Sequence, residues 1–417
     1  MFSATSAQRH MITDSWTSTL LKWVRARNSR TERQSGDSIG SGSNEEKQIV
    51  VREAQFEDFI QISAMNLRLG QGPDSPENWL RLWRDNPAIR ALRAPARIGW
   101  VLQDAGRIVG FLGSIPLSYE FAGAPVLAAA TCRFAVEPPY RVFSHLLVMA
   151  FFRQKEFQLF IDSSATPAAG RIMAAVKAQA IPQRDYDTIL FWVLNPLRYS
   201  AYALRKIGID KTWVAAGSHF GSLALRISSL YWNQEPPAPV KNLEVRQESL
   251  SSLGEQFETF IRKFNIRNQR IFAKRSLEIL QWHFEPPQNR RPVSLLVCYQ
   301  GCSIRGYLIL RNYEETIDGL RRAVVADLLV EDNDPRVTAA LFRFALRAAQ
   351  NSGADILEVT GFPAEIREGL QEWRPYMRKL PANPFYYKAQ EKVLQHRLQQ
   401  ESAWYACPYD GDSTLWP

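Results

Sequence analysis

Residues 134–145, Phe-Ala-Val-Glu-Pro-Pro-Tyr-Arg-Val-Phe-Ser-His, join the apolar end of a predicted strand to the start of a predicted helix. Backbone N–H groups at a helix start have no partner within the helix, and the positive end of the helix dipole favours an anion there. Arg141 adds a positive charge to this corner. The run Arg141-Val142-Phe143-Ser144-His145 therefore predicts a site for a phosphate-like anion, and an ordinary strand–turn–helix corner is the alternative.

A carboxyl group at the end of the next predicted strand is the second candidate for chemistry. The sequence Phe-Gln-Leu-Phe-Ile-Asp-Ser-Ser places Asp162 and Ser163 directly after an apolar run. Burial would raise the pKa of such a carboxyl group, so that it could accept a proton near neutral pH. Asp162 is therefore the candidate general base, and a hydrogen-bonded strand end without a chemical role is the alternative.

The elements that must position these residues occur twice along the chain. A short strand followed by an amphipathic helix, a pair of strands about a turn, a long strand, and a strand followed by a helix appear in the same order in both halves. The matched segments are 49–62 with 243–261, 99–121 with 293–313, 128–141 with 323–336, and 157–173 with 354–370. This order predicts two structurally related halves.

Linker-like composition suggests where these halves begin and end. Residues 34–47 are rich in Gly and Ser, and residues 233–242 are rich in Pro. We expect a flexible N-terminal arm and linker over 1–47, a first domain over 48–235, a second domain over 241–390, and a helix end with an irregular tail over 391–417.

The run Val136-Glu137-Pro138-Pro139-Tyr140-Arg141 is similar to the V-x-P-x-x-R end of the fourth strand in the GNAT acyltransferase superfamily. The order of elements in each half resembles the same family. The resemblance implies an α/β fold with two GNAT-like domains in tandem, each a mixed, mostly antiparallel sheet flanked by helices. It covers residues 48–235 and 241–390.

The resemblance also implies a cofactor site in the first half. In the family, the corner after the fourth strand holds the pyrophosphate of acetyl-CoA, and a backbone N–H of that strand contacts the acyl carbonyl. The implied cofactor-binding residues here are Phe134, Ala135, Val136, Arg141, Val142, Phe143, Ser144 and His145. The corner is degenerate, since Ser144 and Leu146 stand where Gly and Gly or Ala are usual.

Two further departures from the family pattern concern the chemistry. Met173 stands near the position of the usual tyrosine acid, so the resemblance supplies no side-chain acid for the leaving thiolate. Positioning of the amine and polarisation of the carbonyl could then supply most of the rate, with no single acid or base essential. In the second half, residues 330–336 carry acids that would repel a pyrophosphate, so we expect no CoA there.

The leading hypothesis is an acyltransferase that moves an acyl group, acetyl in the first instance, from acyl-CoA to the amine of a small molecule or peptide. The second hypothesis is a catalytically inactive tandem protein that binds a ligand or partner. The third is a Fem-like transferase that uses aminoacyl-tRNA, which the net charge of +9 would suit.

Composition narrows the class of protein further. Four cysteines in 417 residues are too few for a disulfide framework, and five scattered histidines do not complete a zinc site. Arginine is spread along the chain rather than clustered, which favours small anions over nucleic acid. We expect a metal-free, cytoplasmic protein in which residues 13–30, an amphipathic basic stretch, could contact a membrane surface weakly.

Overall fold

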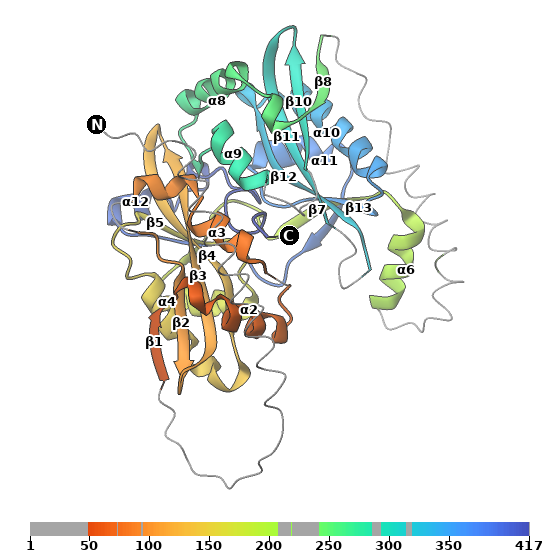
Figure 1. The fold of residues 1–417 in the computed structure, drawn as a ribbon. Helices are drawn as coiled ribbons and strands as arrows, with labels where there is room; N and C mark the ends of the chain where they lie inside the picture. The colour runs from red at the N-terminus through yellow and green to blue at the C-terminus, as the bar shows by residue number, and fades with distance from the viewer. Residues whose placement is uncertain are drawn as a thin grey trace, which may run out of the picture.

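A computed structural model describes residues 49–72, 74–92, 95–206, 218, 242–285, 293–313 and 319–416. It contains two mixed sheets that lie next to each other, each flanked by helices (Figure 1). The predicted α/β class is confirmed. The predicted arm over 1–47, which includes residues 13–30, and nearly all of the Pro-rich stretch 233–242 lie outside the described residues.

Among the described residues, the first half of the chain holds twelve α-helices and β-strands, and the second half holds thirteen. The first set is β1 (Ile49–Glu53), α2 (Phe59–Arg68), α3 (Pro76–Trp83), β2 (Gly99–Asp104), β3 (Arg107–Phe121), β4 (Ala124–Val136), α4 (Ser144–Phe151), β5 (Leu159–Asp162), α5 (Pro167–Ala175), β6 (Gln179–Ala180), β7 (Thr188–Val193) and α6 (Pro196–Lys206). The second set is β8 (Glu244–Glu248), α8 (Glu255–Arg267), β9 (Ile271–Ala273), α9 (Leu277–Phe284), β10 (Ser294–Gln300), β11 (Ser303–Tyr313), β12 (Arg322–Val330), α10 (Pro335–Asn351), β13 (Ile356–Val359), α11 (Ala364–Gln371), β14 (Tyr376–Lys379), β15 (Tyr386–Ala389) and α12 (Lys392–Arg397).

The two sheets share one arrangement of strands. The first has the order β1-β2-β3-β4-β5-β15-β6, with β9 paired to β3, and the second has the order β14-β7-β13-β12-β11-β10-β8. In each sheet one neighbouring pair is parallel, β4 with β5 and β12 with β13, and the other pairs are antiparallel. The predicted mixed, mostly antiparallel sheets are therefore confirmed.

Local sequence explains the helix that covers the second sheet. Helix α10 begins at Pro335, whose missing N–H costs nothing at the first helical position, and the side chain of Asp334 accepts a hydrogen bond from the backbone N–H of Arg336. Its apolar positions recur every three or four residues and are buried, as Val337, Leu341 and Ala345 illustrate.

Two strands cross the predicted domain boundaries. Strand β7, from the first half, lies between β13 and β14 of the second sheet, where Val193 pairs with Ile356. Strand β15, from the second half, lies between β5 and β6 of the first sheet, where Tyr386 pairs with Asp162. The division into 48–235 and 241–390 therefore does not follow the sheets, because strand partners depend on long-range hydrogen bonds that local sequence does not show.

The C-terminal segment, defined here as residues 404–416, is irregular as expected but is not a surface tail. It lies between the two sheets, near the label C in Figure 1. Tyr409 donates its backbone N–H to the carbonyl of Ala326 on β12 (3.0 Å), while Asp412 accepts a hydrogen bond from Ser163 after β5 (2.8 Å). The segment therefore joins both sheets from the inside.

We expect a Gly411→Ala change to reduce the free energy of unfolding by about 1–3 kcal/mol, the usual cost of overpacking a close-packed core. A Cβ atom at Gly411 would overlap with the side chain of the buried Ser163. Chemical denaturation measures the loss. A Ser163→Gly change in the same chain should recover part of it, since the overlapping atoms are then absent.

Gly369→Ala on α11 is the matched control, because nothing lies within 4 Å of a Cβ atom placed there. That variant should keep or slightly raise stability, as alanine is the better helix former. Equal losses for Gly411→Ala and Gly369→Ala would contradict the close packing of the C-terminal segment.

Candidate active site

The strands β4 and β5 pair over only a short stretch and then separate. Their register ends at Ala130 with Ile161, whereas β4 continues to Val136. Opposite β3 the register of β4 shifts beyond Cys132, and Arg133 there has a φ of 51°. A shift of this kind, with an extra residue in one strand, is a β-bulge, which re-aims side chains and often lies next to active sites.

The predicted carbonyl-binding residues lie in the separated part of β4. Phe134, Ala135 and Val136 have no pairing partner on β5, while Ala135 and Val136 pair with β3. The carbonyl of Phe134 accepts a long hydrogen bond of 3.5 Å from the side chain of Gln71. The structure therefore places the backbone of these residues on the part of β4 that extends beyond its pairing with β5.

Asp162 directly follows the last residue of β5 that pairs with β4 and is 5% exposed. The backbone N–H of Ser164 donates to its Oδ1 (3.3 Å). Burial, and secondarily the nearby carboxyl of Asp412, raise the pKa of Asp162 to about 7, and the Thr131 hydroxyl on β4 acts weakly in the opposite direction. A carboxyl group of this kind exchanges a proton near neutral pH, which suits a general base.

Asp412 of the C-terminal segment completes a pair of buried carboxyl groups. Its Oδ1 accepts from Ser163 Oγ (2.8 Å) and its Oδ2 from Ser164 Oγ (3.2 Å). Burial raises the pKa of Asp412, and these hydroxyl donors oppose the rise. Because like charges disfavour double ionisation, the pair titrates as a unit.

The predicted phosphate corner has a different local structure from an open helix start. Residues Pro138–Phe143 form a 3₁₀ helix that runs directly into α4. Prolines 138 and 139 have no N–H, and the N–H groups of Tyr140 and Ser144 donate to the carbonyls of Glu137 and Arg141. Several of the backbone donors that a pyrophosphate would use are therefore missing or already engaged.

The polar side chains at this corner contact nearby backbone carbonyls or are exposed. The hydroxyl of Ser144 donates to the carbonyl of Arg141 (2.7 Å) and so does not cap α4, and His145 Nδ1 lies 2.9 Å from the carbonyl of Val142. Phe143 is half-buried, whereas Arg141, Val142 and His145 are exposed. An anion at this corner would therefore meet the side chains of Arg141 and His145 before it met backbone donors.

A tyrosine that the sequence did not indicate lies beside Asp162. Met173, which stands near the position of the usual acid, is buried in the core. Tyr386 of β15 stands directly opposite Asp162, so both side chains lie on one face of the sheet. Its hydroxyl lies 2.7 Å from where a Cβ atom on Gly170 of α5 would be. No local signal could have found Tyr386, because it enters the first sheet through the exchanged strand.

In the second half, the C-terminal segment packs beyond the point where β12 and β13 stop pairing. The pairing of β12 with β13 ends at Val324 and Glu358, and beyond it the hydroxyl of Tyr405 donates to the carbonyl of Leu328. The carbonyl of Ala406 accepts the backbone N–H of Phe362, which follows β13. The C-terminal segment thus packs beyond the end of this pairing, as its Asp412 does beside Asp162 in the first sheet.

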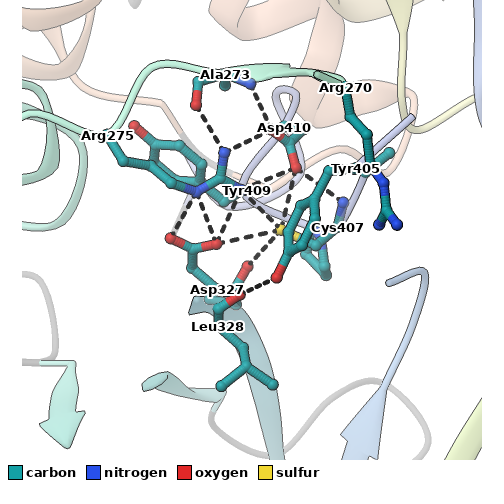
Figure 2. A network of polar contacts seen from close by, with 12 residues as sticks. Arg270, Ala273, Arg275, Asp327, Leu328, Tyr405, Cys407, Tyr409 and Asp410 are labelled. Atoms are coloured by element: carbon teal, nitrogen blue, oxygen red, sulfur yellow. Dashed lines mark hydrogen bonds and ion pairs between the residues drawn. The ribbon is translucent and has the colours of Figure 1, made fainter. Parts of the chain in front are cut away.

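A buried ionic network holds the segment there (Figure 2). Arg275, fully buried, pairs with Asp327 of β12 at 2.9 Å and with Asp410 at 3.1 Å. The thiol of Cys407 lies 3.1 Å from Asp410, and burial raises its pKa, so it remains a neutral thiol. This cluster is saturated with internal contacts and has no free group for catalysis.

Two surface pockets lie outside the gap at Asp162. One, of about 710 Å³, is formed by β1, β2 and α4, and its lining includes Trp100, Met149 and Arg153. The other, of about 440 Å³, lies at the end of β12, where Arg267 pairs with Asp332 (2.6 Å). Neither is lined by any of the predicted site residues.

In the described parts of the chain, no three His, Cys, Asp or Glu side chains are grouped closely enough to hold a metal ion. None of the helices in those parts has the length and apolar character that a membrane crossing requires.

Solved structures with a similar fold include two acyltransferase-type proteins. A GCN5-related N-acetyltransferase from Anabaena variabilis ATCC 29413 aligns over 82% of this chain and 73% of its own, with 12% identity and a TM-score of 0.50. A conserved protein of unknown function from Enterococcus faecalis V583, described as a probable N-acyltransferase, aligns over the same shares with 11% identity and a TM-score of 0.50. No protein-family model and no curated protein matches the sequence. Together with the sheet order and the parting of β4 from β5, this likeness shows that the chain has the fold of the GCN5-related N-acetyltransferases, the GNAT fold.

Proposed function

We propose that the first half transfers an acyl group from acyl-CoA to an amine, with Asp162 as the general base. The observation that carries the proposal is a buried carboxyl group with a pKa of about 7 at the point where β4 and β5 separate. Perturbed carboxyl groups of this kind concentrate at functional sites. The GNAT fold adds the precedent of acyl transfer in the gap between these strands.

The proposed reaction assigns one task to each group. The amine nitrogen attacks the thioester carbonyl carbon and loses a proton to Asp162. A backbone N–H of β4 beside the bulge stabilises the developing oxyanion. The C–S bond then breaks, and the CoA thiolate takes a proton from the Tyr386 hydroxyl or from water. Because a thiol has a pKa near ~8.5, the thiolate is a tolerable leaving group and needs little help from an acid.

The corner geometry favours the second candidate, a protein that binds a ligand without turnover. Two prolines and two engaged N–H groups leave Arg141 and His145 as the exposed polar side chains there. If acyl-CoA binds, its phosphates must rely on these side chains more than on the backbone.

Binding of acyl-CoA separates the two candidates. At a concentration 100 times the Kd, a ligand stabilises the folded state by about 2.7 kcal/mol, so acetyl-CoA or octanoyl-CoA should raise the Tm by roughly 3 °C. Arg141→Glu should abolish this rise, because it replaces the attractive charge with a repulsive one. Thermal unfolding with and without each acyl-CoA is the measurement.

Arg171→Glu on α5 is the control, since it makes the same charge change at another exposed position. It should keep the rise in Tm. If millimolar acetyl-CoA and octanoyl-CoA did not raise the Tm of the wild-type protein, the result would favour the second candidate, a protein without turnover.

A further inference from the structure

Arg133 is held in an unusual backbone conformation at the gap. Its φ of 51° lies in the left-handed region, which costs a non-glycine residue free energy. The bulge directs the side chain toward the C-terminal segment, where the guanidinium carbon lies 4.3 Å from the centroid of the Trp416 ring. Strain of this kind persists where the surrounding structure fixes it, and it is frequent at functional sites.

The guanidinium of Arg133 has no anionic partner in the described parts of the chain. Its Nε atom is buried without a hydrogen bond, and no described carboxylate lies within 4.0 Å of it. Other arginines near the C-terminal segment differ: Arg275 pairs with two carboxylates, and Arg81 donates to the carbonyl of Leu415. A buried N–H without an acceptor is unfavourable, and an acceptor bound beside Arg133 would relieve this cost.

The backbone next to the Trp416 ring is held from both halves of the molecule. Arg81 of α3 donates to the carbonyl of Leu415 (2.8 Å), and Arg311 of β11 donates to the carbonyls of Thr414 and Trp416. The backbone that carries the ring of Trp416 is therefore held by residues of both halves. A guanidinium stacked on such a ring keeps its N–H edge available for a planar anion.

The spacing along β4 relates Arg133 to the carboxyl pair. Thr131, whose hydroxyl acts on Asp162, lies two residues before Arg133, which corresponds to about 7 Å of strand. An anionic group would be repelled by Asp162 and Asp412 and attracted by Arg133. A molecule with an amine and a carboxylate a few bonds apart could place its amine near Asp162 and Asp412 and its carboxylate near Arg133.

We propose that Arg133, stacked on Trp416, binds the carboxylate of the acyl acceptor, so that the acceptor is an amine-bearing carboxylate of the amino-acid class. The proposal rests on the proposed acyl transfer at Asp162. It goes beyond it by naming the chemical class of the acceptor and the residue that selects it.

The test compares amino acids with their α-carboxamides, which differ only in the charged group that Arg133 would bind. Each of the twenty common amino acids and its carboxamide is offered with acetyl-CoA, and release of CoA is followed with a thiol reagent. One or more amino acids should react, and the matching carboxamide should have a kcat/KM at least about 100-fold lower, the loss expected for a charge-assisted bidentate contact. Arg133→Gln should raise the KM for the amino acid by about 100-fold, leave the carboxamide unaffected, and change kcat by less than about threefold.

Arg133→Lys should recover only part of the affinity, because lysine keeps the charge and loses the planar fork. Arg171→Gln is the matched control at an exposed position and should behave as the wild type. Circular dichroism and the Tm establish that each variant is folded. Equal rates with amino acids and carboxamides, or a KM that does not respond to Arg133→Gln, would overturn the assignment.

A binding measurement separates this proposal from the proposed reaction. Saturation-transfer NMR reports which members of the amino-acid and carboxamide mixtures bind, whether or not they react. Binding of amino acids that is lost in Arg133→Gln, without release of CoA, would support the carboxylate site and contradict acyl transfer. Release of CoA with simple amines but no binding of amino acids would contradict the carboxylate site and support acyl transfer. Absence of both would overturn both.

Discussion

An Arg275→Met variant is expected to lose about 3–5 kcal/mol of its free energy of unfolding, the usual cost of removing one partner of a buried ion pair. Asp327 and Asp410 would remain inside the protein without their cation. The guanidinium is fully buried and also lies over the ring of Tyr409, at 4.7 Å from its centroid. Its loss therefore removes a charge and a packing contact at the point where the C-terminal segment meets β12.

Urea or guanidinium denaturation at pH 7 measures this loss, and Lys274→Met is the matched control. Lys274 is the neighbouring cation, with a half-exposed side chain whose ion-pair partner among the described residues is Glu120, at 3.9 Å. Because exposed pairs contribute 0 to about 1 kcal/mol, the control should lose little. If Arg275→Met lost no more than Lys274→Met, the ionic network would not be what holds the C-terminal segment.

The second large effect is expected at Asp162, where asparagine should reduce turnover by about 100-fold or more, the usual contribution of a general base. The wild-type kcat/KM should rise with pH through about 7, as the carboxyl group loses its proton, and this rise should disappear in Asp162→Asn. Initial rates of CoA release between pH 5 and pH 9 measure both. A variant within threefold of the wild type would instead favour catalysis by positioning alone.

Asp162→Asn, which should lower turnover, should raise the stability of the folded protein. The pKa of Asp162 in the folded protein is about 7, above its unfolded value of about 3.9, so the folded state binds more protons between these values. The contribution of the carboxyl group to stability is thus fully present below about pH 4 and is lost as the pH rises through about 7. Asp162→Asn should therefore be more stable than the wild type at pH 8 and gain less at pH 5, as measured by Tm.

Asp412→Asn offers a control that leaves Asp162 in place. It removes the nearby carboxyl that helps to raise the pKa of Asp162, so the rise of kcat/KM should move to lower pH. An unchanged pH profile in this variant would show that Asp412 does not act on Asp162.

The sequence alone determined the order of elements, the fold class and the strand that ends at Asp162. These features have local causes: apolar periodicity, the Asp334-Pro335 start of α10, and turn residues between strands. The resemblance of Val136–Arg141 to a known strand end pointed to the end of β4, which lies beyond its pairing with β5. Local patterns cannot, however, show how the donors of a turn are used, and the 3₁₀ helix over Pro138–Phe143 was therefore not anticipated.

Only the tertiary structure decided the membership of the sheets and the make-up of the site. Strands β7 and β15 have the same local character as other strands, and their exchange depends on hydrogen bonds to residues far along the chain. The C-terminal segment lacks a helical or strand period, so nothing local marked it as core. Its folding between the sheets brings Asp412 to Asp162 and Trp416 to Arg133. A raised pKa and an unpaired cation are properties of such surroundings, because burial and neighbouring charge set them, and those are fixed only when distant segments come together.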